Sequence, residues 1–285
     1  MTLTKRIIDV LDGRGHSLDI DPVMLVEFAS RNKVLLHVLR ILNIEGSLRA
    51  SQERAMMRVV EVIRVLSKIL RGYDYAFFKL VKPVSYVPAD IDLLVRADQA
   101  KKITKTIAGL GYRLVVKDPY CITLAKGGSM IDLYTQPSVG GIIFIDGQKL
   151  LDHTGIAEFS GVEARVLEKY AEALVTASHA IYKEQIYTLN DYITTKSWIS
   201  AKSLKLAEEL KCKSALKLSI KINHMIERGA LETPYKLPPP LWLINMIHKF
   251  REDPLTRTTL AHIFNKTQDS RIGRLIMSRL TRQTY

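Results

Sequence analysis

Three aspartates occur in short apolar segments, where acidic side chains are unusual and therefore point to a specific role. Asp90 and Asp92 belong to the segment DIDLLV (90–95), and Asp132 belongs to MIDLY (130–134). Side chains alternate between the two faces of a β-strand, so Asp90 and Asp92 are expected to share one face while the apolar residues between them point into a core. Because adjacent strands lie about 4.8 Å apart, pairing of the two segments would bring all three carboxylates together.

Carboxylates that lie so close repel one another, and without a counter-ion at least one would take up a proton. A divalent cation resolves this conflict; carboxylate and phosphate oxygens suit Mg²⁺ best, and Mn²⁺ also fits them. In this hypothesis Asp90 and Asp92 hold an ion bound to a triphosphate. Asp132 completes a second ion site and helps to deprotonate an attacking hydroxyl. In the alternative interpretation, these acids only begin a strand or line a solvated sheet face.

The surrounding sequence predicts the elements that would position these acids. Short apolar runs rich in aromatic and branched residues indicate strands, and the pair Gly127–Gly128 indicates a tight hairpin turn. The expected elements are strands at 75–80, 90–95, 112–116, 121–125 and 130–134 and a helix at 98–109. This order predicts an α/β (α+β) fold with a small mixed sheet and helices packed on it.

Helices are expected on both sides of this core, because apolar residues recur there every three or four positions. They cover 23–42 and 52–70 before the core, and 163–194 and 197–228 after it. The segment TPYKLPPP (233–240) cannot be helical throughout, since its prolines lack the amide hydrogen. The expected organisation is an N-terminal helical segment 1–72, an α/β core 73–160, a helical domain 161–232, a proline-rich linker 233–240 and a basic helical tail 241–285.

The segment YAFFKLVKPVSYVPADIDLLV (75–95), together with MIDLY (130–134), resembles the polymerase-beta-type nucleotidyltransferase superfamily. More narrowly, the layout resembles its nucleotidyltransferase-like family, in which helices precede the core and a further helix follows the third acid. That helix is matched here by the stretch with Glu172, Leu174 and His179. The resemblance covers residues 25–225 and implies transfer of a nucleotide from a nucleoside triphosphate to a hydroxyl group.

One feature of that superfamily is missing from this chain. Its members have a Gly-Gly or Gly-Ser turn before the paired acids, which grips the triphosphate through backbone amides. Here no glycine occurs between Tyr73 and Ala108, and the matching region contains Lys79 and Lys82 instead. These lysines are candidates for neutralising the triphosphate as point charges.

Three further residues are candidates for contacting the nucleotide: His179, Lys183 and Asp191. His179 and Lys183 are four positions apart, which places them on one face of an α-helix. The alternative is that all three belong to a solvent-facing, capped side of a helix.

The net charge of +13 is unevenly distributed, because residues 73–195 carry −1 and residues 196–285 carry +10. Such an excess is typical of a surface that binds polyanions, although it also fits an ordinary lysine-rich surface. The expected RNA-binding residues are Lys249, Arg251, Arg257, Arg271, Arg274 and Arg279. Apolar residues interleave with them at helical spacing, so one face is expected to dock on the body.

These observations predict a metal-dependent nucleotidyltransferase that acts on RNA, such as the end of a transfer RNA. Two alternatives stay open: the same chemistry on a protein or small-molecule acceptor, and a degenerate member that binds RNA or a partner without turnover. The chain has no apolar run near the roughly 18 residues that span a bilayer and no signal-peptide pattern at its start. We therefore expect a cytoplasmic protein without membrane contact.

Overall fold

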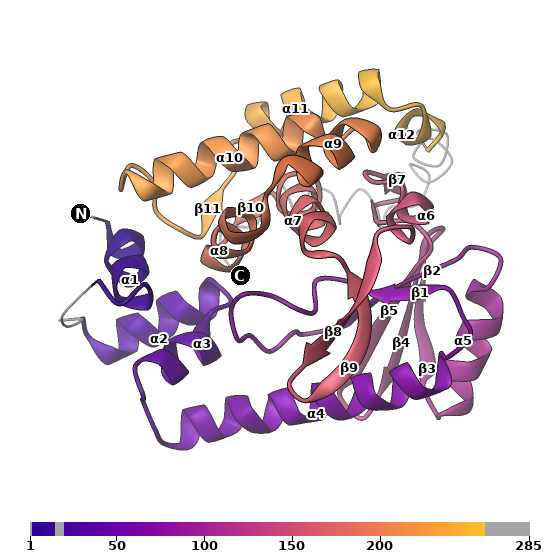
Figure 1. Ribbon diagram of the computed structural model, residues 1–285, viewed down its shortest axis with the longest axis horizontal. Helices are drawn as coiled ribbons and strands as arrows, with labels where there is room; N and C mark the ends of the chain where they lie inside the picture. The colour runs from indigo at the N-terminus through magenta and orange to yellow at the C-terminus, as the bar shows by residue number, and fades with distance from the viewer. Residues whose placement is uncertain (1, 15–19, 260–285) are drawn as a thin grey trace.

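The computed structural model describes residues 2–14 and 20–259. The chain begins with helices α1 (Leu3–Leu11), α2 (Pro22–Arg31), α3 (Leu35–Ile41) and α4 (Ser47–Ile69). Asp21 accepts hydrogen bonds from the first amides of α2, and Pro22 occupies the first turn, where the missing amide hydrogen costs nothing. Helix α4 runs along one face of the central β-sheet, and α1 to α3 lie beyond one end of that sheet (Figure 1).

A seven-stranded mixed sheet forms the centre, in the order β3-β4-β5-β2-β1-β9-β8. Its strands are β1 (Tyr75–Phe77), β2 (Ile91–Val95), β3 (Arg113–Lys117), β4 (Cys121–Lys126), β5 (Ser129–Tyr134), β8 (Thr154–Phe159) and β9 (Val162–Leu167), and α5 (Ala100–Gly109) follows β2. Strand β2 pairs with β5 in parallel and with β1 antiparallel. Gly127 and Gly128, both with positive φ, form the predicted turn between β4 and β5.

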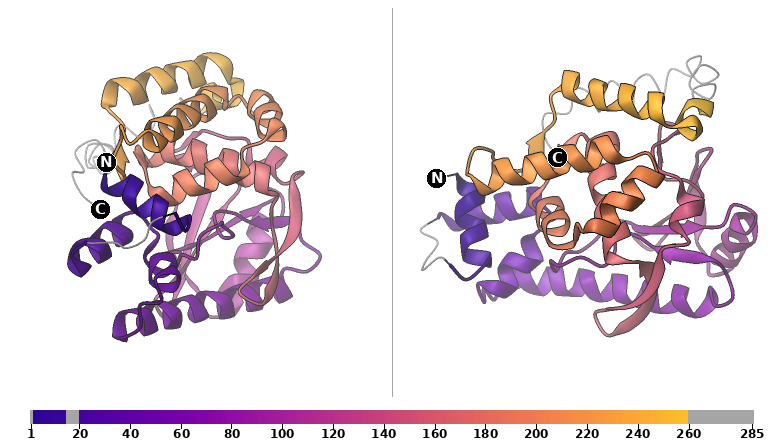
Figure 2. Two further views of the ribbon diagram at one scale, coloured as in Figure 1. Left: turned by 60° about the vertical axis from the view of Figure 1, so that its left-hand side comes forward. Right: turned by 45° about the horizontal axis from the view of Figure 1, so that its top comes forward.

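The C-terminal half is helical and packs on the face of the sheet opposite α4, as Figures 1 and 2 show. Its elements are α7 (Lys169–Ser178), η1 (His179–Glu184), α8 (Leu189–Trp198), α9 (Ala201–Glu209), α10 (Lys213–Glu227), α11 (Pro239–Glu252) and α12 (Pro254–Thr258). Short elements complete the chain: β6 (Ser138–Val139), β7 (Ile142–Ile143), α6 (Gly147–Leu150), β10 (Ile186–Tyr187) and β11 (Tyr235–Lys236). The predicted α/β class with flanking helical regions is confirmed.

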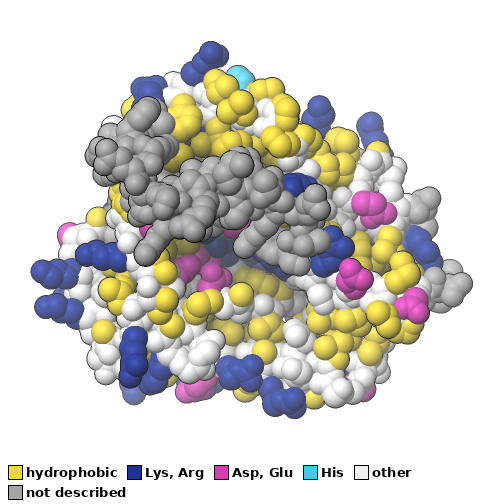
Figure 3. All heavy atoms as spheres, turned by 180° about the vertical axis from the view of Figure 1, so that it is seen from behind, with side chains coloured by type: hydrophobic (Ala, Val, Ile, Leu, Met, Phe, Trp, Pro, Cys, Tyr) yellow, Lys and Arg dark blue, Asp and Glu magenta, His cyan; other side chains and the backbone are white. Residues whose placement is uncertain are grey.

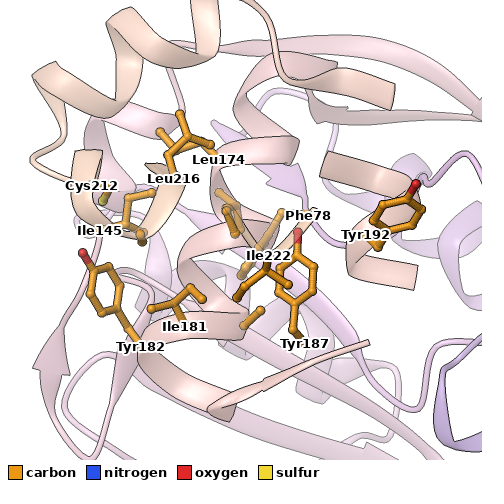
Figure 4. Packing of buried hydrophobic residues seen from close by; sticks show 14 of the residues in the cluster. Phe78, Ile145, Leu174, Ile181, Tyr182, Tyr187, Tyr192, Cys212, Leu216 and Ile222 are labelled. Carbon is orange, nitrogen blue, oxygen red and sulfur yellow. The ribbon is translucent and has the colours of Figure 1, made fainter. Parts of the chain in front are cut away.

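Alternation along β2 divides the core into two layers. Leu93 packs with Ile63 of α4 and with α5, whereas Leu94 packs on the other face with Leu174 and Ile181. Figure 4 shows Leu174 and Ile181 among the buried side chains of this second layer. Asp92 lies two positions before Leu94 in the strand, so it shares the face that the C-terminal helices cover.

One sequence-based expectation needs correction. The helix predicted from residue 163 begins only at Lys169, because 162–167 is strand β9, which pairs with β8 and β1. Its alternating pattern, with Val162, Ala164 and Val166 buried against α4, is that of a strand. The sheet therefore continues past residue 160. As expected, the segment 233–240 is not helical throughout: β11 within it pairs with β10, and α11 begins at Pro239.

Lys249 does not occupy the exposed position expected of an RNA-binding residue. Its side chain is 0% exposed, and its ammonium group lies 3.0 Å from the carbonyl oxygens of Leu210 and Lys211 and 2.7 Å from Asp253. These contacts fasten α11 to the end of α9, so the charge of Lys249 is used inside the protein. Among the described residues, none of the helices combines the length and apolar character that crossing a bilayer requires.

Replacing Lys249 with methionine should lower the free energy of unfolding by about 3–5 kcal/mol, because the Asp253 carboxylate is then left buried without its partner. The matched control is Arg251→Met on the same helix, where the side chain is exposed and the change should stay within about 0.5 kcal/mol. Urea denaturation of both variants measures the difference, and equal losses would contradict the structural role of Lys249.

The same ion pair predicts a pH dependence. Burial alone would raise the pKa of Asp253, but Lys249 and the hydroxyl of Thr256 outweigh it and hold the pKa below its ordinary value. The contribution of Asp253 to stability is therefore complete above about pH 5 and is lost as the pH falls past the ordinary aspartate pKa and through the lower pKa of the folded state. Asp253→Asn should make the free energy of unfolding less dependent on pH between about 5 and 2. An unchanged pH profile in denaturation would contradict this assignment.

Candidate active site

The three aspartates meet as the strand pattern predicts. Asp92 on β2 lies directly opposite Asp132 on β5, and Asp90 immediately precedes β2. One carboxylate oxygen from each residue lies within 4.8 Å of the others. The strand pairing therefore brings acids forty positions apart in the sequence to a single point on the sheet.

The electrostatics of the cluster favour a bound cation. Burial and the neighbouring charge of Asp90 raise the pKa of Asp92 to about 7, although Lys79 acts in the opposite direction. One oxygen of Asp92, Oδ1, is buried without a hydrogen-bond partner. The Asp132 carboxylate accepts a hydrogen bond from the Thr123 hydroxyl at 2.6 Å, which fixes its orientation. Carboxylate oxygens in this arrangement fit a Mg²⁺ or Mn²⁺ ion, and the orphaned oxygen of Asp92 is the atom that such an ion would satisfy.

Lys79 stands inside this cluster. Its ammonium group lies 2.8 Å from Oδ2 of Asp92 and 3.2 Å from Nε2 of His179. Burial alone would lower the pKa of Lys79, but Asp92 and Asp90 raise it above its ordinary value, so the side chain stays charged. The backbone of Lys79 has φ of +57°, in the left-handed region that favours glycine. This turn comes just after β1, which ends at Phe77, and lies where the sequence resemblance leads one to expect a glycine-containing turn.

Glu172 holds this turn, a role that the sequence interpretation did not assign to it. Its carboxylate accepts a hydrogen bond from the Lys79 backbone amide at 2.9 Å and forms an ion pair with Lys82 at 2.6 Å. Lys82 also donates to the hydroxyl of Thr176. The side chains of Lys82 and Glu172 are almost completely buried, so the charge of Lys82 is paired within this loop; a contact between Lys82 and a triphosphate stays a prediction. The signal in the sequence is an acid inside the otherwise small and apolar stretch AEALVTAS (171–178).

His179 and Lys183 both lie near the cluster, but the helix that carries them is a π-helix and not the expected α-helix. They lie in the π-helix η1, in which residues five positions apart are neighbours, and His179 Nε2 is 3.5 Å from the Glu184 carboxylate. Burial and the surrounding lysines hold the pKa of His179 well below its ordinary value, so the imidazole is neutral. The Lys183 ammonium lies 3.1 Å from the hydroxyl of Tyr134.

A cleft of about 330 Å³ opens at the cluster. Asp90, Asp92, Lys79 and Lys82 line it, together with His179, Asn190 and Asp191; Asp132 is not among its lining residues. Asp191 also caps α8 by accepting hydrogen bonds from the amide and hydroxyl of Thr188. Residues of α2 and the following turn, such as Ser30 and Lys33, complete the rim. Figure 3 shows acidic and basic side chains meeting in a hollow near the middle of the molecule.

The expected RNA-binding residues do not reach this cleft within the described part of the chain. Arg251 and Arg257 are exposed on α11 and α12, whereas Lys249 is buried beside Asp253. Arg271, Arg274 and Arg279 lie outside the described residues.

Comparison with known proteins gives matches among solved structures only. No protein-family model and no curated protein sequence matches this chain. Among solved structures, the chain is similar to the lincosamide antibiotic adenylyltransferase LnuA with lincomycin bound, at 14% identity and a TM-score of 0.34, over 51% of this chain and 95% of that one. It is also similar to ANT(2'')-Ia in complex with adenylyl-2''-tobramycin, at 12% identity and a TM-score of 0.33, over 62% of this chain and 97% of that one.

The solution structure of the antibiotic-resistance factor ANT(2'')-Ia matches at 12% identity and a TM-score of 0.33, over 62% of this chain and 91% of that one. The carboxylate cluster and the side chains around it, and not these likenesses, carry the functional conclusion.

The loop-holding role of Glu172 is testable by a double-mutant cycle. Glu172→Gln leaves the Lys82 ammonium buried without a counter-charge and should lower the free energy of unfolding by about 3 kcal/mol or more. Adding Lys82→Met should recover part of that loss, since no unpaired charge then remains. Chemical denaturation of the two single variants and the double variant gives the coupling free energy, and strictly additive losses would contradict the ion pair.

Proposed function

We propose that this protein is a metal-dependent nucleotidyltransferase that moves a nucleoside monophosphate from a nucleoside triphosphate to a hydroxyl group. The single observation that carries this proposal is the in-register placement of Asp92 and Asp132, with Asp90 beside them, where Asp90 and Asp92 line a cleft. A divalent cation held by the three carboxylates would neutralise charge that develops on the phosphates during transfer.

Asp132, Lys79 and His179 are placed to assist the transfer of the nucleotide. An acceptor oxygen attacks the α-phosphorus, the bond to the bridging oxygen breaks and pyrophosphate leaves with the electron pair. Asp132 is oriented by Thr123 and is the carboxylate we assign to take the proton of the acceptor hydroxyl. Lys79, charged and fixed beside Asp92, supplies positive charge near the phosphates. The neutral imidazole of His179 holds the Lys79 ammonium in place from the other side.

The acceptor is proposed to be a small molecule, not RNA. The cleft has the volume of a small-ligand site, and its described lining runs from Ser30 to Asp191 without a residue from α11 or α12. Of the basic residues expected to bind RNA, those that the structure describes lie on α11 and α12 and do not line the cleft. A polynucleotide acceptor would need basic residues near the cleft to bind its phosphates. The charge of residues 196–285 is the observation that still favours RNA, so RNA is one of the acceptors to be tested.

The proposal is tested by incubating the protein with each labelled triphosphate, Mg²⁺ and one of two acceptor pools: total RNA, or a protein-free extract of small molecules. We expect label in the small-molecule pool. Label on RNA would restore the RNA acceptor, and label on the protein itself would indicate a protein acceptor. Label in neither pool nor on the protein would identify a degenerate, non-catalytic member.

Asp92→Asn should abolish the labelled product. Loss of a residue that only supports a metal ligand costs about 10–100-fold in activity, so loss of a direct ligand should cost more. The substitution keeps the side-chain volume, and a thermal melt should show a folded protein. The matched control is the exposed Asp98→Asn, just after β2, which should keep the wild-type rate. If the Asp92→Asn variant kept the full rate, the assignment of Asp92 to the active site would be wrong.

A further inference from the structure

A fixed positive charge already lies among the three carboxylates. The Lys79 ammonium lies 2.8 Å from Asp92 Oδ2, and its side chain is only 16% exposed. The other oxygen of Asp92, Oδ1, has no hydrogen-bond partner. The two oxygens of this carboxylate are thus in different states: one has an internal cation and the other is available to an ion.

The backbone is built to keep Lys79 there. A lysine with φ of +57° is less stable than glycine at the same position, so the surroundings must hold this conformation. Glu172 accepts a hydrogen bond from the Lys79 amide, and the Tyr86 hydroxyl donates one to the Lys79 carbonyl oxygen. Both peptide groups that flank the residue are therefore fixed, and the side chain is aimed at Asp92.

The position of the ammonium group limits where a second ion can bind. Three carboxylates and one ammonium group meet at the cluster. A second divalent cation bound to Oδ2 of Asp92 would lie beside the Lys79 ammonium, which is 2.8 Å from that oxygen, and like charges so close together repel strongly.

We propose that Lys79 takes the place of a second metal ion, so that Asp90, Asp92 and Asp132 bind one divalent cation and not two. This inference deepens the proposed function, on which it rests, and concerns the same site. It also accounts for the lysine in a turn where glycine would be less strained: the turn presents an ammonium group, and the triphosphate meets a fixed charge in place of backbone amides.

The test counts bound Mn²⁺ ions in the full chain, in the presence of a non-hydrolysable ATP analogue, by equilibrium dialysis and electron paramagnetic resonance. We expect one ion per wild-type chain, with the spectrum of an isolated Mn²⁺. Lys79→Gly removes the charge and fits the left-handed backbone without strain, so it should bind two ions with a spin-coupled spectrum. Lys79→Met, which keeps the length of the side chain, should show the same change if the glycine variant fails to fold.

The matched control is Lys211→Gly, since Lys211 also has a positive φ, of +55°, but is exposed after α9 and is not among the residues that line the cleft. It should still bind one ion. A coupled pair in the wild type, no ion in the wild type, or one ion in both Lys79 variants would overturn the inference. A wild type that binds two ions and transfers nucleotide would leave the proposed function intact. One that binds a single ion but transfers no nucleotide to any acceptor would overturn the proposed function alone.

Discussion

Electrostatic repulsion among three carboxylates is the constraint on which the site depends. The parallel pairing of β2 with β5 places Asp92 opposite Asp132, and Asp90 adds a third acid at the same point. The fold tolerates this only because positive charge is brought to it from other elements. Lys79 arrives from the turn after β1, and Lys183 comes from η1. The helices that cover this face are held on the sheet by the buried layer in Figure 4.

The positions of the acids could be predicted from the sequence because strand periodicity is local. Acids at alternate positions of a strand lie on the same face of the sheet. Pairing of the neighbouring strands then brings Asp132 next to Asp90 and Asp92. The same periodicity identifies β9, where the helical interpretation was wrong: VEARVL alternates, yet it adjoins a true helix and was assigned to it. Local patterns therefore define elements well, but they leave the boundary between two of them uncertain.

The ion pairs around the cluster could not be predicted, because each joins residues far apart in the chain. Glu172 meets Lys82 and the Lys79 amide only when α7 packs on the sheet, and nothing near any of them in the sequence indicates the others. Lys249 shows the same limit in part, because Asp253 is only four positions away, whereas the carbonyl groups of Leu210 and Lys211 come from a distant segment. Its spacing is that of a basic surface, yet two carbonyl groups and Asp253 take up its charge inside the protein.

The central claim is that the three aspartates form a divalent-metal site for nucleotide transfer. The most direct measurement is the anomalous diffraction of crystals grown with Mn²⁺ and a non-hydrolysable ATP analogue. The account predicts one anomalous peak within direct coordination distance of Asp90, Asp92 and Asp132, with the α-phosphate of the analogue as a further ligand. Crystals that hold the analogue elsewhere, or that show no peak at these carboxylates while Lys79 keeps its contact with Asp92, would contradict it.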